Sequence, residues 1–213
     1  MAEAAAPAAA AGTPAAPVVF VVEHLEDDMG EWCALEYADM LAKVGAERLL
    51  ITNIPAEHAV QLDPRIPTDS RSLTELGLGT DSVCLLDMRG EGELAPSDAA
   101  EFTHVVFGGI LGDHPPRDRT RALRGNGFAM RHLRERQMST STAVHVCRQI
   151  LMDSVPMGSI PFVDDIELVL SEGDGPKEVV DLPYRYIVGE DGQPQLPAGL
   201  LEYLKSENGS EGF

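Results

Sequence analysis

The chain has few basic residues for its size. Sixteen lysines and arginines stand against 35 aspartates and glutamates, and the formal net charge is −19 over 213 residues. Such a charge repels phosphate backbones, and nucleic-acid binding depends on Lys and Arg that neutralise phosphates. A general nucleic-acid binder is therefore disfavoured, although the basic residues that gather between positions 117 and 136 keep RNA open as a minority alternative. The overall charge favours a cationic partner such as a basic protein.

Cysteine is also scarce, and long apolar runs are missing. Cys33, Cys84 and Cys147 lie far apart in apolar stretches, with no CxxC pair of the kind that binds zinc or undergoes redox cycling. They are expected to be core residues of a protein in a reducing compartment, which predicts a cytoplasmic location. No apolar stretch approaches the roughly 20 residues that span a bilayer, so no membrane association is expected. The histidines are dispersed and predict no metal site.

Composition along the chain predicts one folded domain with two flexible ends. Residues 1–17 are rich in Ala and Pro, carry Glu3 as their single charge, and lack the basic start of a signal peptide, so a disordered extension is expected. Residues 18–205 are numerous enough for a single domain with a full core. Residues 206–213 are polar and are expected to form a flexible tail.

Short apolar runs alternate with amphipathic segments, which predicts an α/β fold with a mostly parallel sheet and helices on both faces. Strands are expected at residues 18–22, 48–54, 82–87, 104–107 and 128–133, and helices at 31–44, 71–76, 97–102, 117–124 and 140–152. After residue 153 the pattern becomes irregular. Two short β-like runs, 166–170 and 184–188, and a short helix near 198–205 are expected there.

The run from Val105 to Arg121 joins an apolar strand end, a glycine-dense turn and a charged helix start. Gly108, Gly109 and Gly112 would let backbone amides approach a ligand that a Cβ would exclude. A GGxxG pattern alone is more often an ordinary strand-to-helix turn. The longer run is more specific, and it predicts a ligand pocket.

Three loops are expected to meet beyond the carboxyl ends of the strands, where open parallel sheets bind their ligands. They follow Phe107, Leu133 and Met152, all in the second half of the chain. The first strand leads into acidic residues where a dinucleotide-binding fold would need GxGxxG. A site made from these later loops suits an adenosine-bearing cofactor.

These loops resemble those of the SPOUT-superfamily protein-arginine methyltransferases. The most specific segment is FGGILGDHPPRDRT at residues 107–120, with supporting matches at 23–37, 83–87, 131–143, 160–164 and 183–186. The resemblance covers nearly the whole chain, from residue 18 to about residue 204. It implies a C-terminal trefoil knot (the SPOUT or α/β-knot fold) and S-adenosylmethionine (SAM) as cofactor. It also implies monomethylation of an arginine on a basic protein of the small ribosomal subunit, by a monomer or weak dimer.

The resemblance also implies a set of cofactor-binding residues in the knot loops. These are Phe107, Gly108, Gly109, Ile110, Leu111, Gly112, Leu133, Gln137, Met138, Thr140 and Thr142. The chain departs from the pattern at three places. Asp165-Ile166 stands where relatives tend to have a Tyr-Pro pair. Arg134 stands where similar proteins have Gly, and Ser141 stands where they have Asp, so position 141 supplies no carboxylate.

An arginine acceptor requires carboxylates, because its guanidinium stays protonated and presents only hydrogen-bond donors. Carboxylates must bind the planar guanidinium through hydrogen bonds and take up its proton. Asp113 in the glycine loop is the preferred candidate, followed by Glu23 after the first strand and Glu36 on the helix that follows. Two alternatives remain open: an RNA methyltransferase of the same fold, and a ribosome-associated binding protein with weak catalysis.

Overall fold

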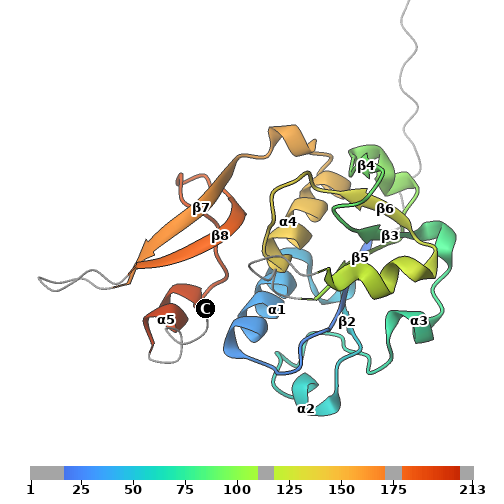
Figure 1. Ribbon diagram of the computed structural model, residues 1–213, viewed down its shortest axis with the longest axis horizontal. Helices are drawn as coiled ribbons and strands as arrows, with labels where there is room; N and C mark the ends of the chain where they lie inside the picture. The colour runs from blue at the N-terminus through green and yellow to red at the C-terminus, as the bar shows by residue number, and fades with distance from the viewer. Residues whose placement is uncertain (1–16, 110–117, 171–178, 207–213) are drawn as a thin grey trace, which may run out of the picture.

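A six-stranded parallel sheet forms the centre of the computed structural model, which describes residues 17–109, 118–170 and 179–206 (Figure 1). The strand order is β2-β1-β5-β3-β6-β4, and every neighbouring pair is parallel. The strands are β1 (Val19–Glu23), β2 (Leu49–Thr52), β3 (Val83–Leu86), β4 (Gly92–Glu93), β5 (His104–Gly108) and β6 (Ala129–His132). Because all six run the same way, their carboxyl ends share one edge of the sheet.

Helices cover the sheet and fill its crossover connections. The α-helices are α1 (Glu31–Val44), α2 (Ala56–Ala59), α3 (Leu73–Leu76), α4 (Thr140–Leu151) and α5 (Leu200–Lys205). Short 3-10 helices are η1 (Ala46–Arg48), η2 (Thr80–Ser82), η3 (Pro96–Ala100), η4 (Arg119–Asn126) and η5 (Met157–Ser159). In the described ranges, no helix combines the length and the apolar character needed to cross a membrane.

Side chains alternate across the sheet and build a core on each face. On β1, Phe20 and Val22 belong to the large core that includes residues of α1 and α4. Val21 points the other way, into a smaller core with Leu73 of α3 and Leu123 of η4. This alternation is what a strand buried on both faces requires. The predicted α/β class, with a mostly parallel sheet and helices on both faces, is confirmed.

A C-terminal hairpin lies beside the sheet as a separate unit (Figure 1). Its strands β7 (Phe162–Val169) and β8 (Val179–Ile187) pair antiparallel, and with α5 they form a third core around Leu182 and Tyr186. Trp32 of α1 joins this core and meets Tyr203 of α5 edge to face at 6.4 Å between ring centroids.

The prediction for this part of the chain was wrong in extent. The strands are 8 and 9 residues long, whereas the sequence predicts two short runs at 166–170 and 184–188. Asp164, Asp165 and Glu167 interrupt the apolar pattern of β7, because one face of the hairpin is open to solvent. The bulge and the exposed face therefore break the regular alternation of apolar residues, so the sequence does not show the full length of the strand.

The helices predicted at 97–102 and 117–124 form as the 3-10 helices η3 and η4, and the helix predicted at 71–76 is the single turn α3. Short polar segments lack the length that favours a full α-helix. The expectations for residues 1–17 and 206–213 fall almost wholly outside the described residues. The trefoil knot stays a prediction.

Candidate active site

The loop after β5 is held against the end of β1 and the start of α4. The Gly109 amide donates to the Glu23 carbonyl oxygen at 3.0 Å, and the Thr140 hydroxyl donates to the Gly109 carbonyl oxygen at 2.9 Å. Gly109 has φ +83°, a conformation that glycine adopts without strain. Two of the predicted cofactor loops thus meet at the carboxyl edge of the sheet.

The first turn of α4 is buried and polar. Ser139 is the N-cap of α4 and is fully buried. Its hydroxyl accepts a hydrogen bond from the Thr142 amide at 3.4 Å and donates one to the Thr142 hydroxyl at 3.1 Å. The Ser141 amide donates to Glu36 Oε2 of α1 at 2.8 Å. A carboxylate at a helix N-terminus accepts from an otherwise unpaired amide and interacts favourably with the helix dipole.

Glu36 is the most unusual of the predicted catalytic acids. Its side chain has no solvent exposure, and its second oxygen, Oε1, has no hydrogen-bond partner among the described residues. Burial raises the pKa of Glu36 to about 7, against the opposing effect of hydrogen bonds from Ser141 and Ser139. The Tyr186 hydroxyl is also buried without a partner in the described part of the chain. Burial raises the pKa of Tyr186, and the nearby charge of Glu36 raises it further. Glu36 therefore exchanges its proton near neutral pH.

Glu23 lies on the other face of the sheet. Its Oε2 accepts from the Thr52 hydroxyl and from the Leu73 amide, at 3.0 Å, at the start of α3. Burial raises the pKa of Glu23, and these hydrogen bonds partly oppose the shift. Its contacts are those of a helix-capping residue, and the structure does not bring it together with Glu36. A catalytic role for Glu23 stays a prediction.

The other predicted site residues divide into three groups. Phe107, Leu133 and Met138 are buried in the core on the α1 and α4 face. Gln137 is half-buried, and its carbonyl oxygen accepts from the Arg185 amide of β8 at 2.8 Å. Ile110, Leu111, Gly112 and Asp113 lie outside the described residues.

Gly108 is required for packing. A Cβ at this position would lie 2.9 Å from Thr120 Cγ2 and 3.5 Å from Leu123 Cδ1, both in η4. The sequence predicts for Gly108 the same purpose as for Gly109, close approach to a ligand. In the structure its missing side chain lets η4 cover the end of β5.

A partly buried ion pair at the end of β3 was not predicted. Asp87, directly after β3, accepts from the Thr120 hydroxyl at 2.5 Å and from Arg124 Nε at 2.7 Å. Arg124 also pairs with Asp118, so the pair holds η4 over the carboxyl edge. Burial would raise the pKa of Asp87, but these hydrogen bonds together lower it. No local pattern signals this pair, since Asp87 lies 33 and 37 positions before Thr120 and Arg124.

Arg134 occupies a glycine-like backbone position in the loop after β6. Its φ is +66°, and its guanidinium is held by Glu93 through two hydrogen bonds. Left-handed backbone costs a residue with a Cβ about 1–2 kcal/mol. Arginine in place of glycine at position 134 therefore lowers the stability of the folded state, and the contact with Glu93 partly offsets this loss.

The chain is similar to a known enzyme family over almost its full length. A family model described as "Protein arginine N-methyltransferase SFM1-like" matches residues 19–211. The chain belongs to this family. Protein arginine N-methyltransferase SFM1 of Saccharomyces cerevisiae is 36% identical over 206 residues, covering 89% of this chain and 95% of the yeast protein.

Two solved structures of the yeast member of the SFM1-like family extend this similarity to the fold. The complex with SAH gives a TM-score of 0.79 at 34% identity, covering 88% of this chain and 94% of the yeast chain. The complex with SAM gives 0.78 at 34% identity, covering 91% and 92%. The predicted membership in a protein-arginine methyltransferase family is confirmed, and the yeast relative binds SAM, the cofactor that the sequence predicts for this chain.

Proposed function

We propose that the protein transfers one methyl group from SAM to an arginine side chain of a basic ribosomal protein. The observation that supports it most is the hydrogen bond from Thr140 to the Gly109 carbonyl oxygen, which joins two of the predicted cofactor loops. It accompanies membership in a family of arginine methyltransferases.

The described residues fit an adenosine-bearing cofactor. Phe107, Leu133 and Met138 place buried apolar side chains beside the predicted cofactor loops, and the half-buried Gln137 and Thr140 are polar residues of the same region. When bound, SAM supplies an electrophilic methyl group on a sulfonium. The chain's residues hold donor and acceptor in line, because alignment is the main requirement of such a displacement.

The acceptor guanidinium has to lose a proton in the course of transfer. Burial raises the pKa of Glu36 to about 7, but its side chain has no solvent exposure and its contact is the Ser141 amide, which cannot relay a proton. We therefore assign Glu36 to positioning the start of α4, and Asp113 to taking up the guanidinium proton. Asp113 remains the proposed direct contact to the guanidinium.

A basic protein is favoured over RNA as the acceptor. The net charge of −19 attracts a cationic surface and repels phosphates. Of the arginines after the glycine loop, Arg124 and Arg131 are paired with Asp87 and Asp98 and so are not free for phosphate contacts. This weakens the alternative of an RNA methyltransferase.

We further propose a cytoplasmic protein without membrane association that acts as a monomer or weak dimer. Three free, buried cysteines suit a reducing compartment. Large apolar side chains exposed in the described part of the chain are few: Val60, Met88, Val169, Val179 and Leu201. Val169 and Val179 are a cross-strand pair, whereas Val60 follows α2, Met88 follows β3 and Leu201 lies on α5. So few exposed apolar side chains offer little surface for self-association.

Incubation with labelled SAM and total ribosomal protein tests the proposed reaction. We expect label on one basic protein, and mass spectrometry should find monomethylarginine. Label in RNA would contradict the proposal. SAM binding by calorimetry without transfer to any basic protein would favour the ribosome-associated binding protein.

A further inference from the structure

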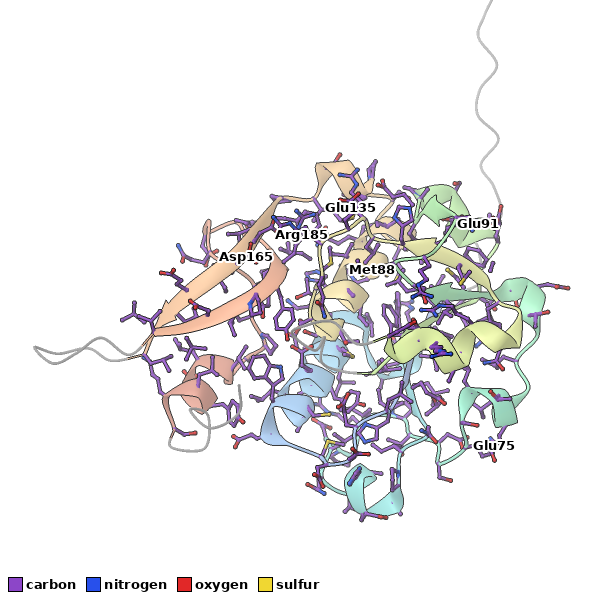
Figure 2. All side chains as sticks on the ribbon, in the orientation of Figure 1. Glu75, Met88, Glu91, Glu135, Asp165 and Arg185 are labelled. Carbon is purple, nitrogen blue, oxygen red and sulfur yellow. The ribbon has the colours of Figure 1, made fainter. Side chains whose placement is uncertain are left out.

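A small cavity lies where the loop after β6 meets the C-terminal hairpin. It has a volume of about 200 Å³ and is lined by Glu135, Arg136, Gln137, Asp164, Asp165, Pro183 and Arg185. Figure 2 shows Glu135, Arg185 and Asp165 one after another along the boundary between this loop and the hairpin, here called the seam. Because Gln137 is also a predicted cofactor residue, the cavity adjoins the proposed methyl-transfer site.

Arg185 is a fixed part of the cavity wall. Its Nε and Nη2 donate to the two oxygens of Asp164 at 2.7 and 2.8 Å, and its guanidinium lies 5.0 Å from the Phe162 ring centroid. Its backbone amide donates to the Gln137 carbonyl oxygen at 2.8 Å. A bidentate pair stacked on a ring is strongly held, so Arg185 and Asp164 neutralise each other.

Asp165 offers a carboxylate that is not held in this way. It sits at the β-bulge of β7 with φ +52°, and its side chain is 61% exposed. Among the described residues, the cation that pairs with it is Arg136, at 3.4 Å from Nη1 to Oδ2. Arg136 Nε also lies 3.6 Å from Asp164 Oδ2.

The Arg136 guanidinium is held loosely. Both of its contacts exceed the usual 2.7–3.2 Å of a good N–H···O hydrogen bond. Its side chain is 58% exposed, and such ion pairs contribute little. An incoming cation can therefore replace Arg136 beside Asp165 at small cost.

We propose that this cavity binds a second basic side chain of the substrate, an arginine or a lysine near the acceptor arginine, with Asp165 as its ligand. Arg136 occupies the position in the free protein and is displaced when the substrate binds. Glu135 adds negative charge to the same wall, while Arg185 is already engaged with Asp164. The inference rests on the proposed function, because it assumes a basic protein substrate.

Fluorescence anisotropy with a labelled penta-arginine peptide tests the cavity without any need for turnover. The Asp165→Asn variant should weaken peptide binding about two- to fivefold, the range expected for one exposed ion pair. Asn is well suited to this variant, since it tolerates positive φ and keeps the side-chain shape. The Arg136→Ala variant should bind the peptide more tightly, because it removes the competing guanidinium.

The matched control is Glu91→Gln, which removes one negative charge from an exposed residue that Figure 2 shows away from the seam. Equal effects of Asp165→Asn and Glu91→Gln would overturn the proposal, because only the total charge would then matter. Weaker binding by Arg136→Ala would show that Arg136 supports peptide binding and does not compete with it, and would also overturn the proposal.

Steady-state transfer separates this inference from the proposed function. With acceptor peptides that carry a second basic residue, Asp165→Asn should raise KM and leave kcat unchanged. With peptides that lack this residue, both parameters should stay as in the wild type. If the wild type methylates no basic protein, the proposed function fails, yet the dependence of penta-arginine binding on Asp165 can still be measured.

Discussion

At the scale of single residues, Glu36 combines a structural and a chemical role. It accepts from the Ser141 amide and so stabilises the start of α4, while its burial raises its pKa to about 7. Asp39 adds negative charge nearby and contributes to the same rise. A carboxyl group in this state links proton binding to the geometry of the α4 N-terminus.

The Glu36→Gln variant should remove a pH dependence of stability. The folded pKa lies above the ordinary value of 4.5, so the folded state binds the proton more tightly, and the free energy of unfolding falls as pH rises from about 4.5 to about 7. A shift of this size corresponds to about 3 kcal/mol. Urea unfolding at pH 5 and pH 7.5 should show a smaller loss of stability for Glu36→Gln than for the wild type.

Glu31→Gln is the control, since Glu31 is exposed on the first turn of the same helix. It should keep the wild-type pH dependence. Equal slopes for the wild type and Glu36→Gln would show that the buried carboxyl does not titrate in this range.

Thr140 makes the contact that joins the two predicted cofactor loops. The Thr140→Val variant keeps the side-chain shape and removes the donor to the Gly109 carbonyl oxygen. We expect a loss of about 1 kcal/mol in stability, and calorimetry should show weaker SAM binding. Thr74→Val is the matched control, because it removes a hydroxyl that donates to Asn126 on exposed surface. Unchanged SAM affinity in Thr140→Val would separate this contact from the cofactor site.

At the scale of elements, helix ends were predicted best. The helix predicted at 31–44 ends where expected because Gly45 has φ +80°, which permits the turn into η1. The helix predicted at 140–152 begins at Thr140 behind the N-cap Ser139. Edge strand β4 and the single turn α2 were missed, since two to four residues carry no periodic pattern.

Ser139→Ala should test how much the cap contributes to α4. Loss of an N-cap side chain costs about 1 kcal/mol, and here the hydroxyl is fully buried and also contacts the Thr142 hydroxyl. Thermal unfolding should show a lower Tm than for Ser70→Ala, which alters an exposed loop serine. Equal Tm values would mean that Glu36 alone suffices to stabilise the helix start.

At the scale of the whole molecule, charge decides which partners can approach. A net charge of −19 creates a field that attracts basic surfaces and is screened by salt. Most described arginines are already paired with acids, as Arg124, Arg131, Arg134 and Arg185 show. The unpaired charge at the surface is therefore largely negative.

Binding of a basic acceptor should accordingly weaken with salt. The Kd of a penta-arginine peptide should rise on the order of tenfold between 50 and 300 mM NaCl, because exposed charge pairs are screened over that range. Anisotropy titrations at several salt concentrations measure this slope. A single-stranded RNA of similar length should show no binding under the same conditions, and tight RNA binding would contradict the protein-acceptor proposal.

The sequence by itself determined the α/β class, the parallel sheet and the family, because alternating apolar runs fix which strands are buried and the residues at 107–120 form a specific motif. Tertiary structure alone decided the surroundings of the acids. Glu23 and Glu36 look equivalent in the sequence, yet one caps α3 and the other lies buried at α4, on opposite faces of the sheet. Their environments depend on contacts between residues 50 and 105 positions apart, and the local pattern of a chain does not encode such distant pairings.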